Sequence, residues 1–461
     1  MNIKSGFRLR AFFLTAIFAG IVIFSFSASS KADEQILLDM IKDQAGEIEM
    51  LKKQVLQLQE NQSASENKIS ENMNSIAMMP KKDAELFPEG LTESLDIGVG
   101  ATFIVQGASK GNRTAERKDE HPWDATLSVD IGIEKTFDEW GMVFASLEYD
   151  NGGGLDGNGR MQLFSDVNGD VNGAGSTVEV SEVWYEHYFF DKRFILTAGK
   201  IDPCAYVDDN AYANDETTQF LNCAFINSTA FNNGARVDSG PGVRIAWEPV
   251  DWCDFNLVGG TTGGTWDNIG NNLTGMAQVA FKPNWIQNSE GGYREGNYRF
   301  YGWYAHACDD FPIWDTSGQI NRDYNYGFGV SFDHELVDAI GVFGRFGWAD
   351  PEVSIVEYSW GSGFHLNGKY WGRKNDMIGA GIGQNIPGNK WAETDNNGGD
   401  KEEGVFEIYY SFHVNEYLSI SPDFQIIWNP YGAGSKTEGP SDNTGRDETV
   451  YVYGLRGQLD F

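Results

Sequence analysis

Sixteen segments of the chain alternate between apolar and polar residues, and this two-residue period limits the possible fold more than any other feature. In residues 95–106, Leu95, Ile97 and Phe103 share one face, whereas Asp96 and Gln106 share the other. Side chains of a strand point alternately to its two faces. Such segments, about ten residues long and separated by turn-rich stretches, are typical of membrane barrels. We therefore expect an all-β fold, a 16-stranded antiparallel transmembrane β-barrel over residues 95–461.

The connections between these segments alternate in length. Long connections rich in Gly, Asn and Asp follow odd-numbered segments, and most even-numbered segments end in tight turns, as in outer-membrane barrels. An even strand number then places both ends of the barrel in the periplasm of a Gram-negative cell. The expected strands are Leu95–Gln106, Asp124–Lys135, Trp140–Tyr149, Val178–Phe190, Arg193–Gly199, Gly242–Glu248, Cys253–Thr261, Gly275–Pro283, Tyr298–Ala307, Tyr326–Asp333, Gly341–Trp348, Val356–Leu366, Met377–Ile386, Val405–Val414, Leu418–Asn429 and Thr449–Phe461.

Composition agrees with strands that are apolar on one face only. The chain has 55 Gly and 14% aromatic residues, and its mean hydropathy of −0.39 argues against a series of membrane helices. The net charge of −33 makes nucleic acid an unfavourable partner. It is consistent with a solvated acidic exterior or with a field that disfavours anions near a pore mouth.

The first 32 residues have the three parts of a secretory signal peptide. A basic start precedes the apolar run Ala11–Phe26, and Ser30-Lys31-Ala32 is a small-x-small cleavage site. An uncleaved anchor is the alternative, although the apolar run is short for a membrane span.

Residues 33–78 change to a period of three and four, which predicts a periplasmic coiled-coil helix. Ile41, Ile48 and Val55 take one seam position, with Leu51 and Leu58 at the other. One such helix cannot bury its stripe, so we expect a homo-oligomer, either a dimer or a trimer. A lone helix packed on the barrel is the alternative. Residues 79–94, which follow, form a linker.

The longest polar connection, Lys200–Pro241, is expected to fold into the barrel and narrow it. It carries apolar residues such as Phe220, Phe225 and Phe231, so its composition is not that of a disordered segment. A packed surface excursion is the alternative. Cys204 and Cys223 both lie in it, and we expect a disulfide between them. Cys253 and Cys308 fall at opposite rims, too far apart to bond.

Charged side chains on the polar faces are expected to line the lumen, because a basic residue facing lipid at mid-depth costs about 2–4 kcal/mol. Opposite the acidic loop they would set a transverse field suited to hydroxyl-rich solutes. Alternatively, they pair with one another and hold the barrel's shape. The predicted constriction residues are Arg244, Arg299, Arg345, Arg456, Glu407, Asp208, Asp209, Asn210 and Lys200.

Signals for catalysis, cofactors or metals are weak. The six His show no metal-ligand spacing, and no nucleophile motif or phosphate-binding loop occurs. Asp166–Gly173 hints at calcium, but Val171 stands where an EF-hand needs Gly. We expect no cofactor and no enzyme activity, with a barrel hydrolase as the least favoured class.

Several stretches resemble the carbohydrate-selective porin family of the OprB type. The carrying residues are Gly199-Lys200-Ile201-Asp202, Asp208-Asp209-Asn210, Gln219–Asn222 with Ala224-Phe225, and Arg345–Pro351. The resemblance covers about 95–461 and implies a sixteen-stranded barrel for sugar diffusion, with a constriction of arginine and acidic side chains. The helix at 33–78 and the loop cysteines depart from the family pattern. The final strand ends on Phe461 and resembles the signal read by the barrel-assembly machinery.

These features predict a passive outer-membrane channel, in contact with outer-membrane lipids, for small hydrophilic solutes, with carbohydrates as the expected class. Two alternatives stay open: a general cation-preferring porin, and a structural barrel that tethers or oligomerises through its coiled coil.

Overall fold

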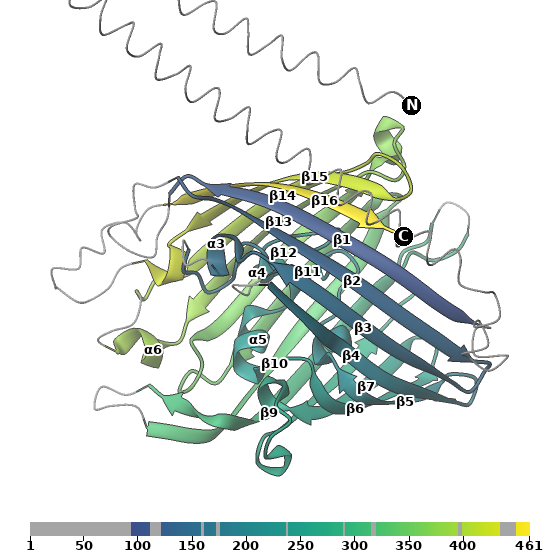
Figure 1. Cartoon of the computed structure of the whole chain (residues 1–461), viewed down its shortest axis with the longest axis horizontal. Coiled ribbons are helices and arrows are strands. Elements are labelled where there is room, and N and C mark those ends of the chain that lie inside the picture. Colours follow the sequence, from purple (N-terminus) through teal and green to yellow (C-terminus); the bar gives the residue numbers. More distant parts are fainter. Residues whose placement is uncertain are drawn as a thin grey trace, which may run out of the picture. The chain divides into compact units, whose positions relative to one another are not determined.

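Sixteen antiparallel strands of the described residues close into one barrel, in which the last strand pairs with the first (Figure 1). The structure is a computed structural model, and it describes residues 94–110, 121–157, 161–171, 176–236, 238–288, 291–314, 320–394, 399–433 and 449–461. The expected signal peptide, coiled coil and nearly all of the linker lie outside these residues.

The predicted strand number and order are confirmed. Each strand pairs with its neighbours in sequence, and Ala101 lies opposite Leu459 where the barrel closes. The strands are β1 Leu95–Ala108, β2 Trp123–Phe137, β3 Gly141–Asn151, β4 Ser176–Phe189, β5 Phe194–Ile201, β6 Gly240–Val250, β7 Cys253–Thr261, β8 Leu273–Phe281, β9 Gly296–Ile313, β10 Ile320–Val337, β11 Ile340–Ala349, β12 Val356–Asn367, β13 Met377–Pro387, β14 Glu403–His413, β15 Leu418–Trp428 and β16 Val450–Asp460.

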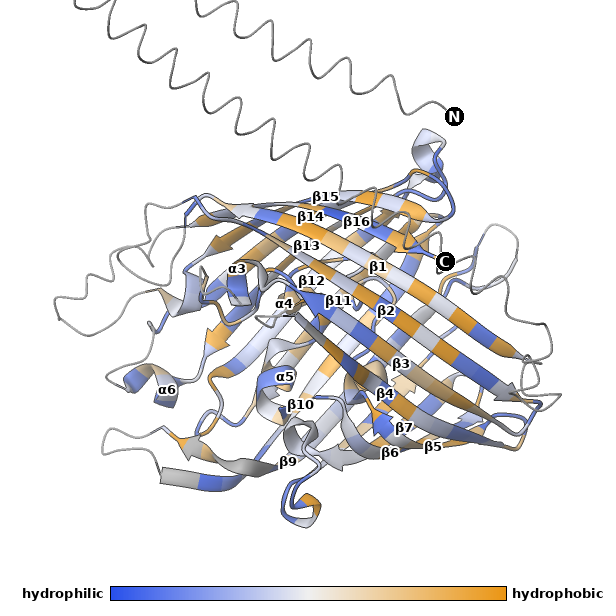
Figure 2. Ribbon diagram, viewed as in Figure 1, coloured by the Kyte–Doolittle hydropathy of each residue, from blue (hydrophilic) through white to orange (hydrophobic). Residues whose placement is uncertain are grey.

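The alternation predicted from the sequence sets which side chains face outward. In β16, Tyr451, Tyr453 and Leu455 are exposed, whereas Arg456 and Gln458 are buried on the inner side. Figure 2 shows the resulting bands of apolar residues along the outer wall. An outer face of this kind suits contact with lipid, with polar groups kept inside. Among the described residues, no helix is both long and apolar enough to cross a bilayer.

Long connections and short turns occupy opposite rims of the barrel. The longest strands, β9 and β10, run several residues past their predicted ends at the long-loop rim. Two long connections fold inward with short helices: α3 (Gly154–Gly157) lies against β1 and β2, and α5 (Thr229–Ala235) against β9–β12. α4 (Cys223–Ile226) contacts β12 and β13, and α6 (Asn389–Glu393) follows β13.

A charge placed on the outer face tests this orientation. Leu257 lies at the centre of β7 and is 55% exposed. We expect Leu257→Lys to lower the free energy of unfolding by about 2–4 kcal/mol, because an ammonium at mid-depth has no partner in lipid. The measurement is urea unfolding from liposomes. Leu257→Ala is the matched control with a smaller expected loss, and equal losses in the two variants would argue that this face does not meet lipid.

Candidate pore constriction

The connection between β5 and β6, residues 202–239, lies inside the barrel and is called the constriction loop. Its turns begin with residues whose side chains cap short helices. Asp202 accepts a hydrogen bond from the backbone N–H of Cys204 (2.9 Å), and Asn222 accepts one from Ala224 (3.0 Å). Ser228 caps α5 through the N–H of Phe231 (3.4 Å). These local bonds give a polar stretch a defined shape.

Aromatic side chains of the loop are packed against the barrel wall, as the sequence led us to expect. Phe220 lies in edge-to-face contact with Phe343 (5.4 Å) and Tyr409 (5.1 Å). Phe231 packs in the same way on Tyr301 and Trp303. All six rings are buried, so the loop is held to the wall over a large apolar area.

Strand glycines make room for this loop. A Cβ on Gly347 would stand 2.0 Å from the hydroxyl of Ser228, and one on Gly341 would stand 2.1 Å from the ring of Tyr212. Glycine within a strand often marks a place where another backbone approaches closely. Here it lets the constriction loop lie directly on β11.

Arg345 clamps the constriction loop to the wall, whereas the sequence predicted that it would contact solute. Its Nε donates to Asp208 Oδ1 (2.9 Å), and its Nη atoms donate to the carbonyls of Phe225, Asp208 and Ala213. The side chains of Arg345 and Asp208 are 2% and 0% exposed. Both are thus covered by the loop that they hold.

Three further predicted residues also turn out to anchor the loop. Arg456 donates to the carbonyls of Glu216 (2.6 Å) and Gln219 (2.9 Å). Glu407 accepts from the N–H groups of Leu221 and Asn222, and Asn210 donates to Ser331 and Phe332. All three are buried. The sequence correctly placed them inside the barrel but could not show that the loop would cover them.

Lys200 is not in the constriction. β5 extends to Ile201, so Lys200 is part of the strand and shares its outward face with Leu196 and Ala198, while Thr197 is buried on the inner face. Its ammonium donates to the carbonyl of Val180 (2.7 Å) at the long-loop end of the neighbouring strand.

The predicted disulfide is also absent: Cys204 and Cys223 are both free. The thiol of Cys204 lies 3.6 Å from Asn232 Oδ1, and Cys223 is the first residue of α4, fixed by its N–H to the carbonyl of Asp166. Capped turns and packed rings therefore shape the loop without a covalent staple. Cys253 is free at the start of β7.

A second inward loop escaped the sequence analysis. Residues 152–157 and 161–171, called the companion loop, pack against the constriction loop, with the N–H of Gly169 bonded to Leu221 O (2.8 Å). Glu403 on β14 anchors it by accepting from the N–H groups of Phe164 and Ser165. The Asp-rich stretch considered for calcium thus makes protein contacts, including Asp170 with Ser128. The aromatic and apolar residues of the companion loop were the sequence feature that could have predicted an inward-packed loop.

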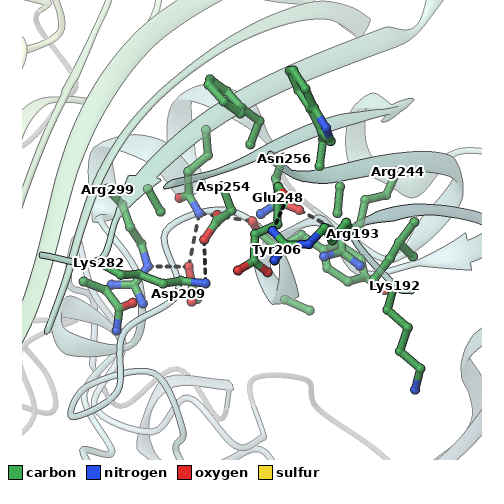
Figure 3. Close-up of a pocket in the computed structure, with 18 residues that line it drawn as sticks. Lys192, Arg193, Tyr206, Asp209, Arg244, Glu248, Asp254, Asn256, Lys282 and Arg299 are labelled. Carbon is green, nitrogen blue, oxygen red and sulfur yellow. Dashed lines mark hydrogen bonds and ion pairs between the residues drawn. The ribbon is translucent and has the colours of Figure 1, made fainter. Parts of the chain in front are cut away.

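The remaining predicted constriction residues, Asp209, Arg244 and Arg299, line an open pocket of about 270 Å³ on the short-turn side of the constriction loop (Figure 3). Arg244 lies over the ring of Tyr206 at 4.3 Å and donates to Asn256 (2.9 Å) and Glu186 (3.3 Å). Arg299 pairs with Asp209 (2.8 Å) and with Asp333. The side chain of Asp209 is 43% exposed, whereas those of Arg244 and Arg299 are 16% and 6% exposed, so the pocket presents the carboxylate to the lumen more than the guanidinium groups.

Two more polar groups of this pocket were not singled out from the sequence. Lys282 pairs with Asp254 at 2.9 Å, and Gln278 donates to Asp209 (3.2 Å). Figure 3 shows Lys282 and Arg299 close to Asp254 and Asp209. Alternating guanidinium, ammonium, amide and carboxylate groups can exchange hydrogen bonds with a polyol without binding it tightly.

A row of carboxylates lies on the neighbouring part of the wall, β2–β4. Asp130 on β2 is directly opposite Glu148 on β3, and Glu148 is opposite Glu179 on β4. Like charges in register repel each other. This carboxylate row therefore gives β2–β4 a negative potential, whereas Arg244, Lys282 and Arg299 belong to the part of the wall from β6 to β9.

Comparison with known proteins agrees with this arrangement. Residues 127–461 match the family described as carbohydrate-selective porin, OprB family. The chain belongs to the OprB family. Membership and the barrel fold together indicate a channel in the outer membrane of a Gram-negative bacterium.

Individual relatives of this OprB family member are distant. The high-pH structure of Pseudomonas putida OprB has a TM-score of 0.65 and 18% identity, covering 83% of this chain and 96% of that one, a likeness of fold. A triple mutant of the Rhodopseudomonas blastica porin has a TM-score of 0.43 and 11% identity, covering 80% of this chain and 100% of that one. An uncharacterized protein of Aquifex aeolicus is 27% identical over 239 residues, which are 51% of this chain and 60% of the relative.

Within the described ranges, no three His, Cys, Asp or Glu side chains are grouped so as to hold a metal ion. The family and fold are those of a channel rather than of an enzyme.

The clamp can be tested by removing its cation. Arg345→Gln would leave the carboxylate of Asp208 buried without its partner, which typically costs about 3–5 kcal/mol. We expect the constriction loop to leave the wall intermittently, giving larger and noisier single-channel currents and faster proteolysis within 202–239. Lys369→Gln, which removes an exposed ion pair with Asp338, is the control and should change neither. A quiet channel of unchanged conductance in Arg345→Gln would contradict the clamp.

Proposed function

We propose that the protein is a passive diffusion channel for small hydrophilic solutes, with carbohydrates as the main class. The observation that carries this proposal is the open pocket beside Tyr206, lined by Arg244, Arg299 and Asp209 at the narrowed level of the barrel, with Asp209 the most exposed of the three. Membership of the carbohydrate-selective porin family supports the solute class.

The pocket would act by replacing the water around a sugar. Guanidinium groups donate to hydroxyls, and carboxylates such as Asp209 and Asp254 accept from them. Because Arg299 and Lys282 are each already paired with an acid, neither is available as an uncompensated charge. A solute therefore finds many exchangeable hydrogen bonds and no strong ionic trap, which permits both entry and release.

A general cation-preferring porin is the second candidate, and the carboxylate row favours it. Asp130, Glu148 and Glu179 would concentrate cations along one wall whether or not a sugar is present. The two candidates differ in whether added sugar competes with ion flow.

The N-terminal segment has a separate proposed task. A coiled coil at 33–78 would join copies of the chain in the periplasm, as a dimer or trimer, or tether the envelope. The signal peptide at 1–32, the linker at 79–94 and recognition of Phe461 by the barrel-assembly machinery belong to the same proposal.

Sugar block of the current tests the main proposal. In planar bilayers we expect discrete conductance steps that fall when glucose is added, and liposomes should swell in isosmotic sugar. Arg244→Ala with Arg299→Ala should weaken the block at least severalfold, since hydrogen-bond donors are lost from the pocket. Arg322→Ala, which removes an ion-paired arginine outside this pocket, is the control and should leave the block intact. A cation-selective current that ignores sugar would instead favour the general porin.

Deletion of residues 33–78 tests the N-terminal proposal. We expect channel activity and sugar block to persist while cross-linking detects fewer subunits in the assembly. Ile48→Lys with Val55→Lys in the intact chain is a matched variant, because it charges the seam without shortening the chain. An unchanged subunit number in both would assign assembly to the barrel alone, and loss of envelope integrity with intact transport would identify tethering as the main role.

A further inference from the structure

A second pocket, of about 350 Å³, lies at the long-loop rim on the other side of the constriction loop. It is called the vestibule pocket. Asn232, Asn233 and Arg236 line it from the end of α5, and Phe311 and Trp314 line it from the end of β9. Its volume falls within the roughly 300–1,000 Å³ usual for small-molecule sites.

Its lining combines an apolar base with hydrogen-bonding groups. Phe311 is almost fully buried, and Val353 and Ile355 add aliphatic surface. The indole N–H of Trp314 is buried and has no hydrogen-bond partner among the described protein atoms. Two amides and one guanidinium complete the lining, and the described lining residues include no carboxylate. Apolar surface with a few convergent polar groups is the usual character of a ligand site.

Arg236 is held over this pocket by the fold. It ends α5 in a left-handed conformation with φ of 46°, which is uncommon for a residue with a Cβ. Its carbonyl accepts from the N–H of Gly263 (2.8 Å), and its guanidinium lies 4.5 Å from the centre of the Phe311 ring.

The vestibule pocket adjoins the route to the constriction. Asn232 also lines a neighbouring pocket of about 450 Å³ that contains Asp202, Glu216 and Asp238, and Ala205 lines both that pocket and the constriction pocket. The three pockets therefore follow one another across the constriction loop. The middle one holds three carboxyl groups. Burial raises the pKa of Glu216 to about 8, so the negative charge of this pocket near pH 7 lies on Asp202 and Asp238, which disfavour an anionic solute.

We propose that the vestibule pocket is the first docking subsite for a neutral sugar ring on its way to the constriction. The inference rests on the proposed function and adds the place and charge class of the initial contact. The half-buried Trp314 supplies aromatic surface for the ring beside the buried Phe311, while Asn233 and Arg236 supply donors for its hydroxyls. Neutral sugars fit because the next pocket carries acidic groups.

The experiment measures sugar block of single channels with glucose added to one side at a time. We expect Trp314→Ala and Arg236→Gly each to raise the apparent dissociation constant about threefold or more for glucose on the long-loop side. Glycine is chosen at 236 because it accepts the positive φ and so preserves the turn. Trp266→Ala is the matched control: this Trp is 61% exposed between β7 and β8 and outside these three pockets.

The outcomes separate this inference from the proposed function. Unchanged glucose affinity in both variants, with unchanged conductance in salt alone, would overturn the subsite and leave the channel proposal standing. Stronger block of the wild type by glucuronate than by glucose would overturn the neutral class. Absence of any sugar block in the wild type would overturn the proposed function itself.

Discussion

A buried ion pair between Arg345 and Asp208 holds the constriction loop inside the barrel, and the pockets along the lumen depend on it. The pair has almost no exposure, and the remaining donors of Arg345 are used by loop carbonyls. Such a pair is weak evidence for stability, because removing two charges from water is expensive. Its effect is to specify one loop position, since any shift would leave a buried charge unpaired.

Apolar packing also holds the constriction loop in this position, over surface that the ion pair does not contact. Phe220, Phe225 and Phe231 fill the space between the loop and the wall, and glycines on β11 and β13 leave the volume that they and their neighbours need. The companion loop adds a second layer through Glu403 and through backbone bonds to the constriction loop. The narrow part of the barrel is thus a protein core built inside a membrane wall, with open pockets only where this core ends.

The charged groups that line the three pockets follow one another along the lumen. A cation with an aromatic partner lies at the long-loop side, carboxylates follow in the middle pocket, and paired charges of both signs lie beyond. The carboxylate row of β2–β4 runs beside them. This distribution suits solutes that hydrogen-bond without net charge, and it explains how a strongly acidic chain can belong to a family of sugar porins.

The number of strands, their order and the side on which each residue lies could be predicted from the sequence, because side-chain direction follows a period of two and lipid accepts only apolar groups on one face. The same pattern placed Arg244, Arg299, Arg345, Arg456 and Glu407 inside. It could not tell which of them meet water, since that depends on which loop covers each one.

Only the tertiary structure decided that Arg345, Arg456 and Glu407 serve as anchors, that Arg244 and Arg299 line the open pocket, and that the companion loop enters the lumen. It also placed Lys200 on the outer face, because β5 is longer than its pattern indicated, and left Cys204 and Cys223 unbonded. The physical reason is the same throughout: periodicity reports the face of a strand, whereas a partner is chosen by contacts between residues far apart in the chain.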